Sequence, residues 1–172
     1  MAKTLEGLRA STFVDKTFAT GEGYTVDNKK KAIALPYNKA LKKWVRLTLP
    51  STGLSTVVQV LDVGPYLWWD EEFILRGKRP MAEWFYENNC AFPSVTDGHK
   101  RWGDISFAGK VPTSRASVDL TPPVWWDLGV DKTENELRSF SVDDMIMEWF
   151  VPEPIILEEE EEDDEMPDWL KL

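Results

Sequence analysis

The stretch from residue 44 to residue 65 constrains the fold most, because it specifies two strands and two turns in direct succession. Residues Trp44–Leu49 alternate apolar and polar side chains with a period of two, which is typical of a half-buried strand. Residues Pro50–Gly53 have the composition of a turn, and the β-branched run Thr56–Leu61 predicts a buried strand. The sequence Asp62-Val63-Gly64-Pro65 then ends that strand sharply. This succession of strands and turns favours a fold made mainly of short β-strands.

Three other segments predict further strands. Residues Thr12–Phe18 alternate loosely, and Lys31–Leu35 predicts a strand or a helical turn that Pro36 ends. Residues Ser141–Val151 predict a closing strand, or a short amphipathic helix that begins near Ser141.

One helix is predicted after the strand pattern at residues 116–120. Residues 116–120 form a strand pattern, and Thr121 is a candidate N-cap with Pro122 at the first helical position. Gly129 marks the end of a helix of about two turns. A further strand is expected after Gly129.

Residues 66–115 have no clear period and predict a long irregular insertion. Aromatic side chains are mixed there with charges and glycines, and a long stretch of this kind is usually either functional or contains elements that the pattern does not reveal. Two interpretations stay open: the aromatic residues form a ligand-binding surface, or they form a local core that holds the insertion against the barrel. The aromatic residues in question include Trp68, Trp69, Phe73, Trp84, Phe85, Tyr86, Phe92, Trp102 and Phe107.

The charge of the chain is concentrated at one end. The net charge is −10, and residues 158–165 are eight consecutive acids, without which the net charge is −2. This balance argues against binding to nucleic acid. We expect residues 152–172 to be an acidic, flexible tail. The apolar residues that end it, such as Trp169 and Leu170, could dock on a partner protein or on the chain's own body, or form a frayed terminus.

The chain has one cysteine, Cys90, and one histidine, His99. This excludes an internal disulfide, a zinc site with several cysteines and a histidine-rich metal site. A Cys90–His99 dyad is the only cysteine–histidine pair that the sequence allows, although a lone cysteine is more often a small buried residue. We expect no cofactor and no metal.

Neither a signal peptide nor a transmembrane segment is predicted. Residues 1–9 lack an apolar segment, and no segment approaches the ~18–20 apolar residues that span a bilayer. The expectation is a protein that is cytoplasmic as synthesised.

Three separated blocks together resemble a known fold family. They are Thr20-Gly21-Glu22-Gly23-Tyr24 followed by Leu35-Pro36, then the strand that ends in Asp62-Val63-Gly64-Pro65, and Val118-Asp119-Leu120-Thr121 followed by Leu128-Gly129. This combination resembles the double-psi β-barrel of rare lipoprotein A and the expansins. The resemblance implies a six-stranded barrel over residues 1–151, with the insertion at about 66–115 and the tail at 152–172. In two places the sequence departs from the family pattern, with Ala32 at a position of histidine and Val63 at one of arginine.

The resemblance also implies a function that concerns peptidoglycan or a related β-linked polysaccharide. Carried over by position, Asp62, Asp119 and Glu22 are the catalytic candidates for a cleavage like that of lytic transglycosylases, with Asp62 as the acid. His99 could replace the missing histidine if the insertion folds back over the site. The candidates for substrate binding are residues of the insertion that can stack on sugar rings or bind hydroxyl groups: Tyr66, Trp68, Trp69, Arg79, Glu83 and Trp102.

Two alternatives to catalysis stay open. An Asp before Gly-Pro often only fixes a turn, and the same barrel could be a non-catalytic structural or assembly module. A component of a phage virion or tail would fit, because such a protein needs no signal peptide and meets the cell wall at infection or lysis.

Overall fold

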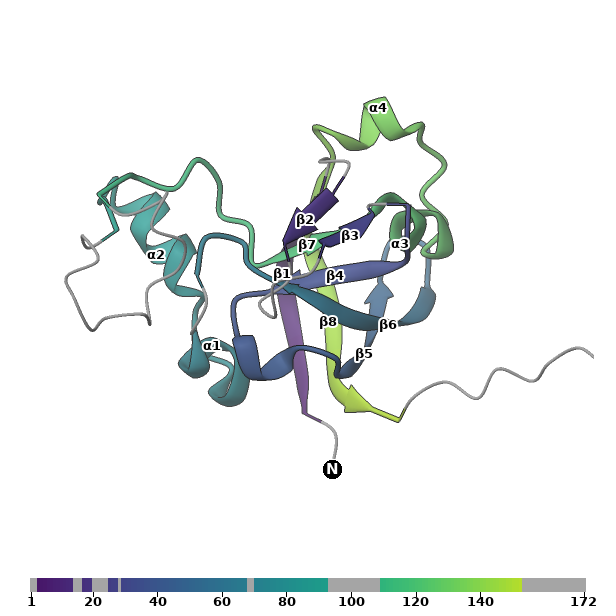
Figure 1. The fold of residues 1–172 in the computed structure, drawn as a ribbon, viewed down its shortest axis with the longest axis horizontal. Coiled ribbons are helices and arrows are strands. Elements are labelled where there is room, and N and C mark those ends of the chain that lie inside the picture. The colour runs from purple at the N-terminus through teal and green to yellow at the C-terminus, as the bar shows by residue number, and fades with distance from the viewer. Residues whose placement is uncertain are drawn as a thin grey trace, which may run out of the picture.

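Six strands close a β-barrel. The computed structural model describes residues 3–13, 17–19, 25–27, 29–67, 70–92 and 109–152, and within these the barrel strands follow the order β1-β7-β4-β6-β5-β8 (Figure 1). β1 pairs with β7 and β4 pairs with β6 in parallel, whereas the other four pairs are antiparallel. The predicted six-stranded barrel is confirmed. Its strands are β1 (Thr4–Thr12), β4 (Ala32–Leu35), β5 (Trp44–Leu49), β6 (Leu54–Val63), β7 (Val118–Leu120) and β8 (Ser141–Val151).

The described residues also contain four short α-helices, where the sequence indicated one or two. Two of them, α1 (Glu71–Arg76) and α2 (Met81–Glu87), lie in the insertion. They occupy one side of the barrel, and α3 (Pro122–Asp127) lies on the opposite side (Figure 1). The remaining elements are α4 (Glu134–Leu137), the 3₁₀ turn Asn38–Ala40 and a two-stranded sheet of β2 (Thr17–Ala19) and β3 (Thr25–Asp27).

Several boundaries follow the sequence closely. β5 has the predicted bounds, residues 32–35 are a strand, and Ser141–Val151 is a strand and not a helix. Thr121 precedes α3 as predicted, although its hydroxyl donates to Lys30 O at 2.7 Å instead of capping the helix. The hydroxyl therefore ties the start of α3 to the start of β4.

Two predictions were wrong. The first strand was predicted at Thr12–Phe18, but β1 runs from Thr4 to Thr12. Register shifts around Leu8 break the alternation in β1, so the sequence pattern does not reveal this strand. No strand follows Gly129 within residues 130–140. The short helix α4 begins there instead, at a capping box in which the Thr133 hydroxyl and the Glu136 side chain bond to each other's backbone N–H.

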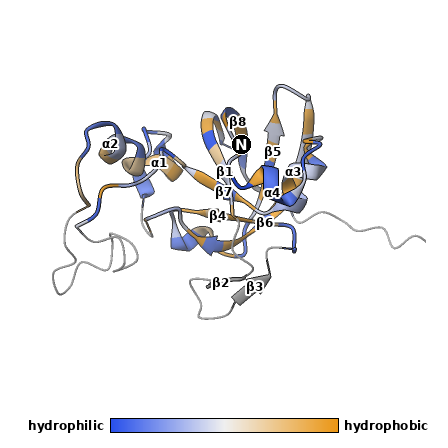
Figure 2. Cartoon of the chain, turned by 90° about the horizontal axis from the view of Figure 1, so that it is seen from above, coloured by the Kyte–Doolittle hydropathy of each residue, from blue (hydrophilic) through white to orange (hydrophobic). Residues whose placement is uncertain are grey.

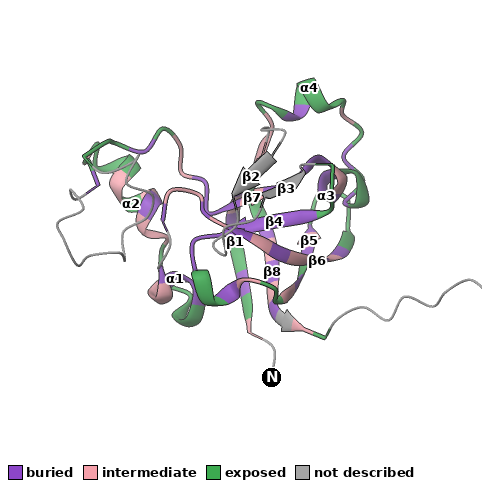
Figure 3. Cartoon of the chain, viewed as in Figure 1, coloured by how far each residue is buried: buried purple, intermediate pink, exposed green. Residues whose placement is uncertain are grey.

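Aliphatic side chains fill the barrel. Figure 2 shows hydrophobic residues along the barrel strands, and Figure 3 shows β4 buried throughout. Trp125 on α3 is fully buried and packs edge-to-face on Phe140, with the ring centroids 5.1 Å apart. The central members of this core are Leu8, Ile33, Leu35, Val45, Leu47, Val58, Val60, Val118, Leu120, Met145 and Met147.

The insertion has a small core of its own. Leu67, Ala82 and Phe92 are buried there. Phe92 lies against Phe85, with ring centroids 4.9 Å apart, and against Tyr66 at 5.9 Å. These aromatic side chains therefore serve the packing of the insertion. Trp84, in contrast, is 47% exposed.

Asp70 connects the two helices of the insertion. It is 2% exposed, and its carboxylate accepts hydrogen bonds from Phe73 N at 3.3 Å and from Met81 N at 2.7 Å. We expect Asp70→Ala to lower the free energy of unfolding by about 1–3 kcal/mol, because it leaves two N–H groups at helix starts without an acceptor. Urea unfolding measures this change, with the exposed Asp131→Ala as control. Equal midpoints for the two variants would contradict the role.

Candidate functional site

Two of the three predicted acids lie in one row across the barrel wall. Ala34 on β4 is the register partner of Asp62 on β6, and on its other side it is the partner of Asp119 on β7. Adjacent strands are ~4.8 Å apart, so the Cα atoms of the two acids lie roughly 10 Å apart. Ser11 on β1 continues the row beyond Asp119, and Ser141 on β8 follows Ser11. We call these five residues the acid row.

Asp119 and Ala34 face the outside of the barrel. Val118 and Leu120 belong to the core, so Asp119 between them faces outward, as does Ala34 between Ile33 and Leu35. On β6, Asp62 continues the alternating burial of Val58 and Val60 and is itself buried. A register shift at Leu61 adds one residue to β6 opposite β4, and this bulge, which the sequence pattern does not reveal, makes Asp62 the partner of Ala34.

Asp62 has an unusual protonation equilibrium. Its side chain is buried, with the residue 7% exposed. Desolvation, together with the negative charge of Asp119, raises the pKa of Asp62 to about 7, although a hydrogen bond from Val63 N at 2.8 Å acts in the opposite direction. At neutral pH a large fraction of Asp62 is therefore protonated, as a general acid requires.

Asp119 is held by a serine. Burial raises the pKa of Asp119, and the Ser11 hydroxyl, which donates a hydrogen bond to Asp119 Oδ1, acts in the opposite direction by stabilising the ionised carboxylate. Ser11 is a residue of the site that the sequence analysis missed. A single serine in an irregular strand carries no signal by itself, and only the parallel pairing of β1 with β7 places it at Asp119.

The predicted substrate-binding residues that are described make hydrogen bonds within the insertion. The Tyr66 hydroxyl is 3.0 Å from the hydroxyls of both Thr113 and Ser114, within the insertion. Arg79 Nε donates to Glu83 Oε1 at 3.1 Å. Arg79 and Glu83 border a groove of about 590 Å³ between the insertion and the first half of β1. Leu5, another residue that lines this groove, is six strand positions from Ser11, or roughly 20 Å.

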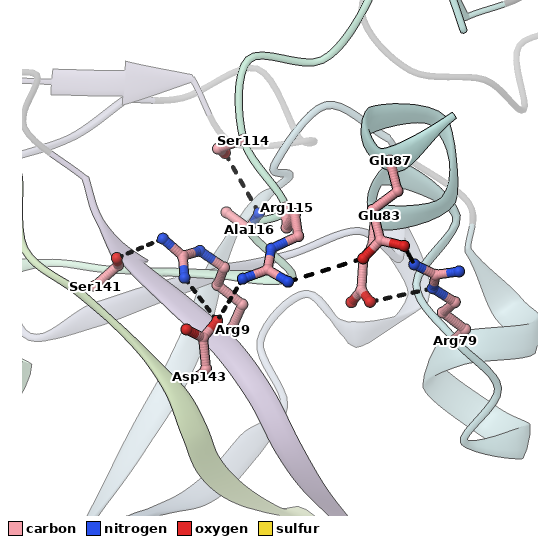
Figure 4. Close-up of polar contacts among 9 residues, drawn as sticks. All are labelled: Arg9, Arg79, Glu83, Glu87, Ser114, Arg115, Ala116, Ser141 and Asp143. Atoms are coloured by element: carbon pink, nitrogen blue, oxygen red, sulfur yellow. Dashed lines mark hydrogen bonds and ion pairs between the residues drawn. The ribbon is translucent and has the colours of Figure 1, made fainter. Parts of the chain in front are cut away.

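Ion pairs connect the insertion to the barrel beside the acid row. Figure 4 shows Arg9 and Arg115 converging on Asp143, at 2.6 and 3.5 Å, while Arg115 also reaches Glu87 on α2 at 3.8 Å. Glu87 in turn pairs with Arg79. Because these side chains are partly exposed to solvent, each pair contributes little to stability. The network orients α2 toward the face that carries the acid row.

The other candidates lie outside the described residues. These are Glu22, Trp68, Trp69 and Trp102, together with His99 of the proposed dyad. Cys90, the other member of that dyad, is half-buried, with its Sγ 3.3 Å from Asn88 O. Ala32, at the family position of histidine, is fully buried against Phe13 and Leu61.

Among the described residues, no group of three or more His, Cys, Asp or Glu side chains is placed to hold a metal ion. No helix in the same part of the chain has the length and apolar character to cross a membrane. No protein-family model matches the sequence, and no curated protein matches it either.

Proposed function

We propose that the barrel binds peptidoglycan or a related β-linked polysaccharide and cleaves it with Asp62 and Asp119, in the manner of the rare lipoprotein A family that the sequence resembles. The observation that carries the proposal is the acid row: two carboxyl groups flank Ala34, the charge of one acts on the other, and one of them has a pKa of about 7. Glycosidic bonds are cleaved by such pairs, in which one carboxyl group donates a proton and the other stays ionised.

In this proposal Asp62 protonates the glycosidic oxygen while the bond between that oxygen and the anomeric carbon breaks. The bonding electrons go to the oxygen, which leaves as a hydroxyl group, and Asp119 stabilises the positive charge on the sugar ring. The sugar's own 6-hydroxyl oxygen then attacks the anomeric carbon and forms a 1,6-anhydro ring. Its proton passes to the Asp62 carboxylate, so the acid is regenerated without water.

The surroundings of the two acids suit these roles. Ala34 is the partner of both acids, and the Ser11 hydroxyl favours the ionised form of Asp119. The histidine of the family would stand at position 32, two residues before Ala34. With Ala32 there, proton transfer in this chain falls to Asp62.

Incubation with purified, insoluble peptidoglycan tests the proposal. We expect soluble fragments with 1,6-anhydro ends, detected by mass spectrometry, and co-sedimentation of the protein with the insoluble wall. Co-sedimentation without fragments would reduce the function to glycan binding. If neither fragments nor co-sedimentation occur, the glycan function is rejected.

A second function is a structural or assembly module on the same barrel, such as a component of a phage virion or tail. The hydrogen bond that Asp62 accepts from Val63 N favours it, because the same bond fixes the end of β6. This function predicts a negative result in both peptidoglycan assays and a protein that co-purifies with assembled particles.

A further inference from the structure

The face of the barrel that carries α3 exposes two large apolar side chains. Trp126 is 49% exposed and Leu54 is 48% exposed, whereas the neighbouring Trp125 is fully buried. The Trp126 indole is fixed, because its Nε1 donates to Lys132 O at 2.9 Å. Gly129, with φ of +78°, lets Leu54 approach, since an added Cβ would lie 2.8 Å from Leu54 Cδ1. Gly129 lies one helical turn after Trp126, so Leu54 and Trp126 border the same surface.

Lysine side chains border these apolar residues. Lys29, Lys30 and Lys31 are all exposed at the start of β4. The Lys31 ammonium lies 2.5 Å from Asp127 Oδ2, at the end of α3, and Thr56 Oγ1 donates to the same oxygen at 3.1 Å. The lysine run, the end of α3 and the start of β6 are therefore contiguous. We call the set Lys29–Lys31, Leu54, Trp126 and Lys132 the α3 surface.

The residues that follow the barrel leave it close to this surface. Val151, the last residue of β8, is the register partner of Trp44, which pairs with Gln59, which pairs with Ala32. Three strand spacings of ~4.8 Å separate Val151 from Ala32, or roughly 14 Å. Lys31 directly precedes Ala32.

The sequence beyond residue 152 matches the α3 surface in charge, in polarity and in order. Residues 158–165 are eight consecutive acids, followed by the apolar residues Met166, Trp169, Leu170 and Leu172. Five residues, 153–157, lie between Pro152 and the run of eight acids, and the extended chain from Pro152 to Glu158 spans ~20 Å, which exceeds the distance to Lys31. The acids therefore meet the lysine run first, and the apolar residues reach Leu54 and Trp126 beyond it.

We propose that residues 153–172 dock on the α3 surface of their own chain. The acidic run faces Lys29–Lys31, and the Trp169-Leu170 segment covers Leu54 and Trp126. Charge attraction at this surface is long-ranged and weakened by salt, and burial of two exposed apolar side chains adds a term that salt does not screen. This inference is independent of the glycan function, because Leu54, Trp126 and the lysine run are not members of the acid row.

Hydrogen exchange and cross-linking of the full chain test the docking. In the monomer, a zero-length carbodiimide reagent should join lysines 29–31 to glutamates of the acidic run, as identified by mass spectrometry. Amides of residues 166–172 should exchange roughly tenfold more slowly than in the free peptide of the same sequence. Charge reversal at all three lysines (Lys29→Glu, Lys30→Glu, Lys31→Glu) should abolish both effects.

Matched variants separate docking from general changes. Trp84→Ala removes a tryptophan of similar exposure on α2 and should leave the exchange of residues 166–172 slow, whereas Trp126→Ala should accelerate it. Charge reversal at Arg76, Lys78 and Lys110, which are exposed in the insertion, alters the net charge equally and should also leave exchange slow. If the amides of residues 166–172 in the unaltered chain exchange as fast as in the free peptide, the proposal is overturned. Cross-links confined to dimers, which would indicate docking on a second copy, or equal effects of the two tryptophan variants would also overturn it.

Discussion

Replacing Asp62 with asparagine is expected to lower the rate of peptidoglycan cleavage by roughly 10²–10⁴-fold, the usual contribution of a general acid. Asparagine keeps the size of the side chain and its ability to accept the hydrogen bond from Val63 N, but its amide has no acidic proton to transfer to the substrate. The release of fragments with 1,6-anhydro ends, followed over time, measures the loss. Because binding does not need the proton, co-sedimentation with the insoluble wall should persist.

The pH dependence of the unaltered protein provides a second measure of the same role. With the pKa of Asp62 at about 7, the rate should fall as pH rises through 7, since the protonated fraction decreases. Asp131→Asn removes an exposed carboxylate on the loop after α3 and should retain both the rate and its pH profile. An Asp62→Asn variant with the unaltered rate would exclude Asp62 as the acid.

Asp62→Asn is also expected to stabilise the fold at high pH. The pKa of Asp62 is raised from 3.8 to about 7 on folding, so the folded state holds the proton more tightly than the unfolded state. Stability from this group is fully present below pH ~4 and is lost as pH rises through 7. The loss is on the order of 4 kcal/mol for a shift of this size at 1.36 kcal/mol per pKa unit. An amide at position 62 does not ionise and avoids this loss.

Urea unfolding of both proteins at pH 5 and pH 8 measures the stabilisation. Asp62→Asn should have a higher free energy of unfolding than the unaltered protein, and this difference should be larger at pH 8 than at pH 5. Asp131→Asn, whose side chain is exposed, should follow the unaltered protein at both values. A difference between Asp62→Asn and the unaltered protein that does not change with pH would contradict the raised pKa.

The two expectations for Asp62 have one physical cause. The burial that raises its pKa makes it a proton donor near neutral pH and makes its ionised form costly in the folded state. Active sites often combine function with a local loss of stability in this way. A variant that is more stable at pH 8 and inactive on peptidoglycan would link both properties to the same side chain.

Local sequence patterns predicted the elements that depend on neighbouring residues. The alternation in Trp44–Leu49 set the bounds of β5, and the Thr121-Pro122 pair marked the start of α3. The prediction missed most of β1, where register shifts interrupt the pattern, and it missed α1 and α2, whose starts share Asp70 as a hydrogen-bond acceptor. For β1 the pairing partners are distant in the sequence, whereas Asp70 is a local signal, the N-cap of α1, within a segment that lacks a clear period.

The sequence by itself determined a fold of short strands, and its resemblance to a known barrel family predicted six of them and singled out Asp62 and Asp119. The spatial relation of the two acids was not predictable, because a local pattern carries no information on which strands become neighbours. Only the tertiary structure put β4 between β6 and β7, placed Ser11 at Asp119, and used a bulge at Leu61 to make Asp62 the partner of Ala34. The pKa of Asp62 depends on the same decision, since desolvation and the charge of Asp119 arise from neighbours that only the closed barrel supplies.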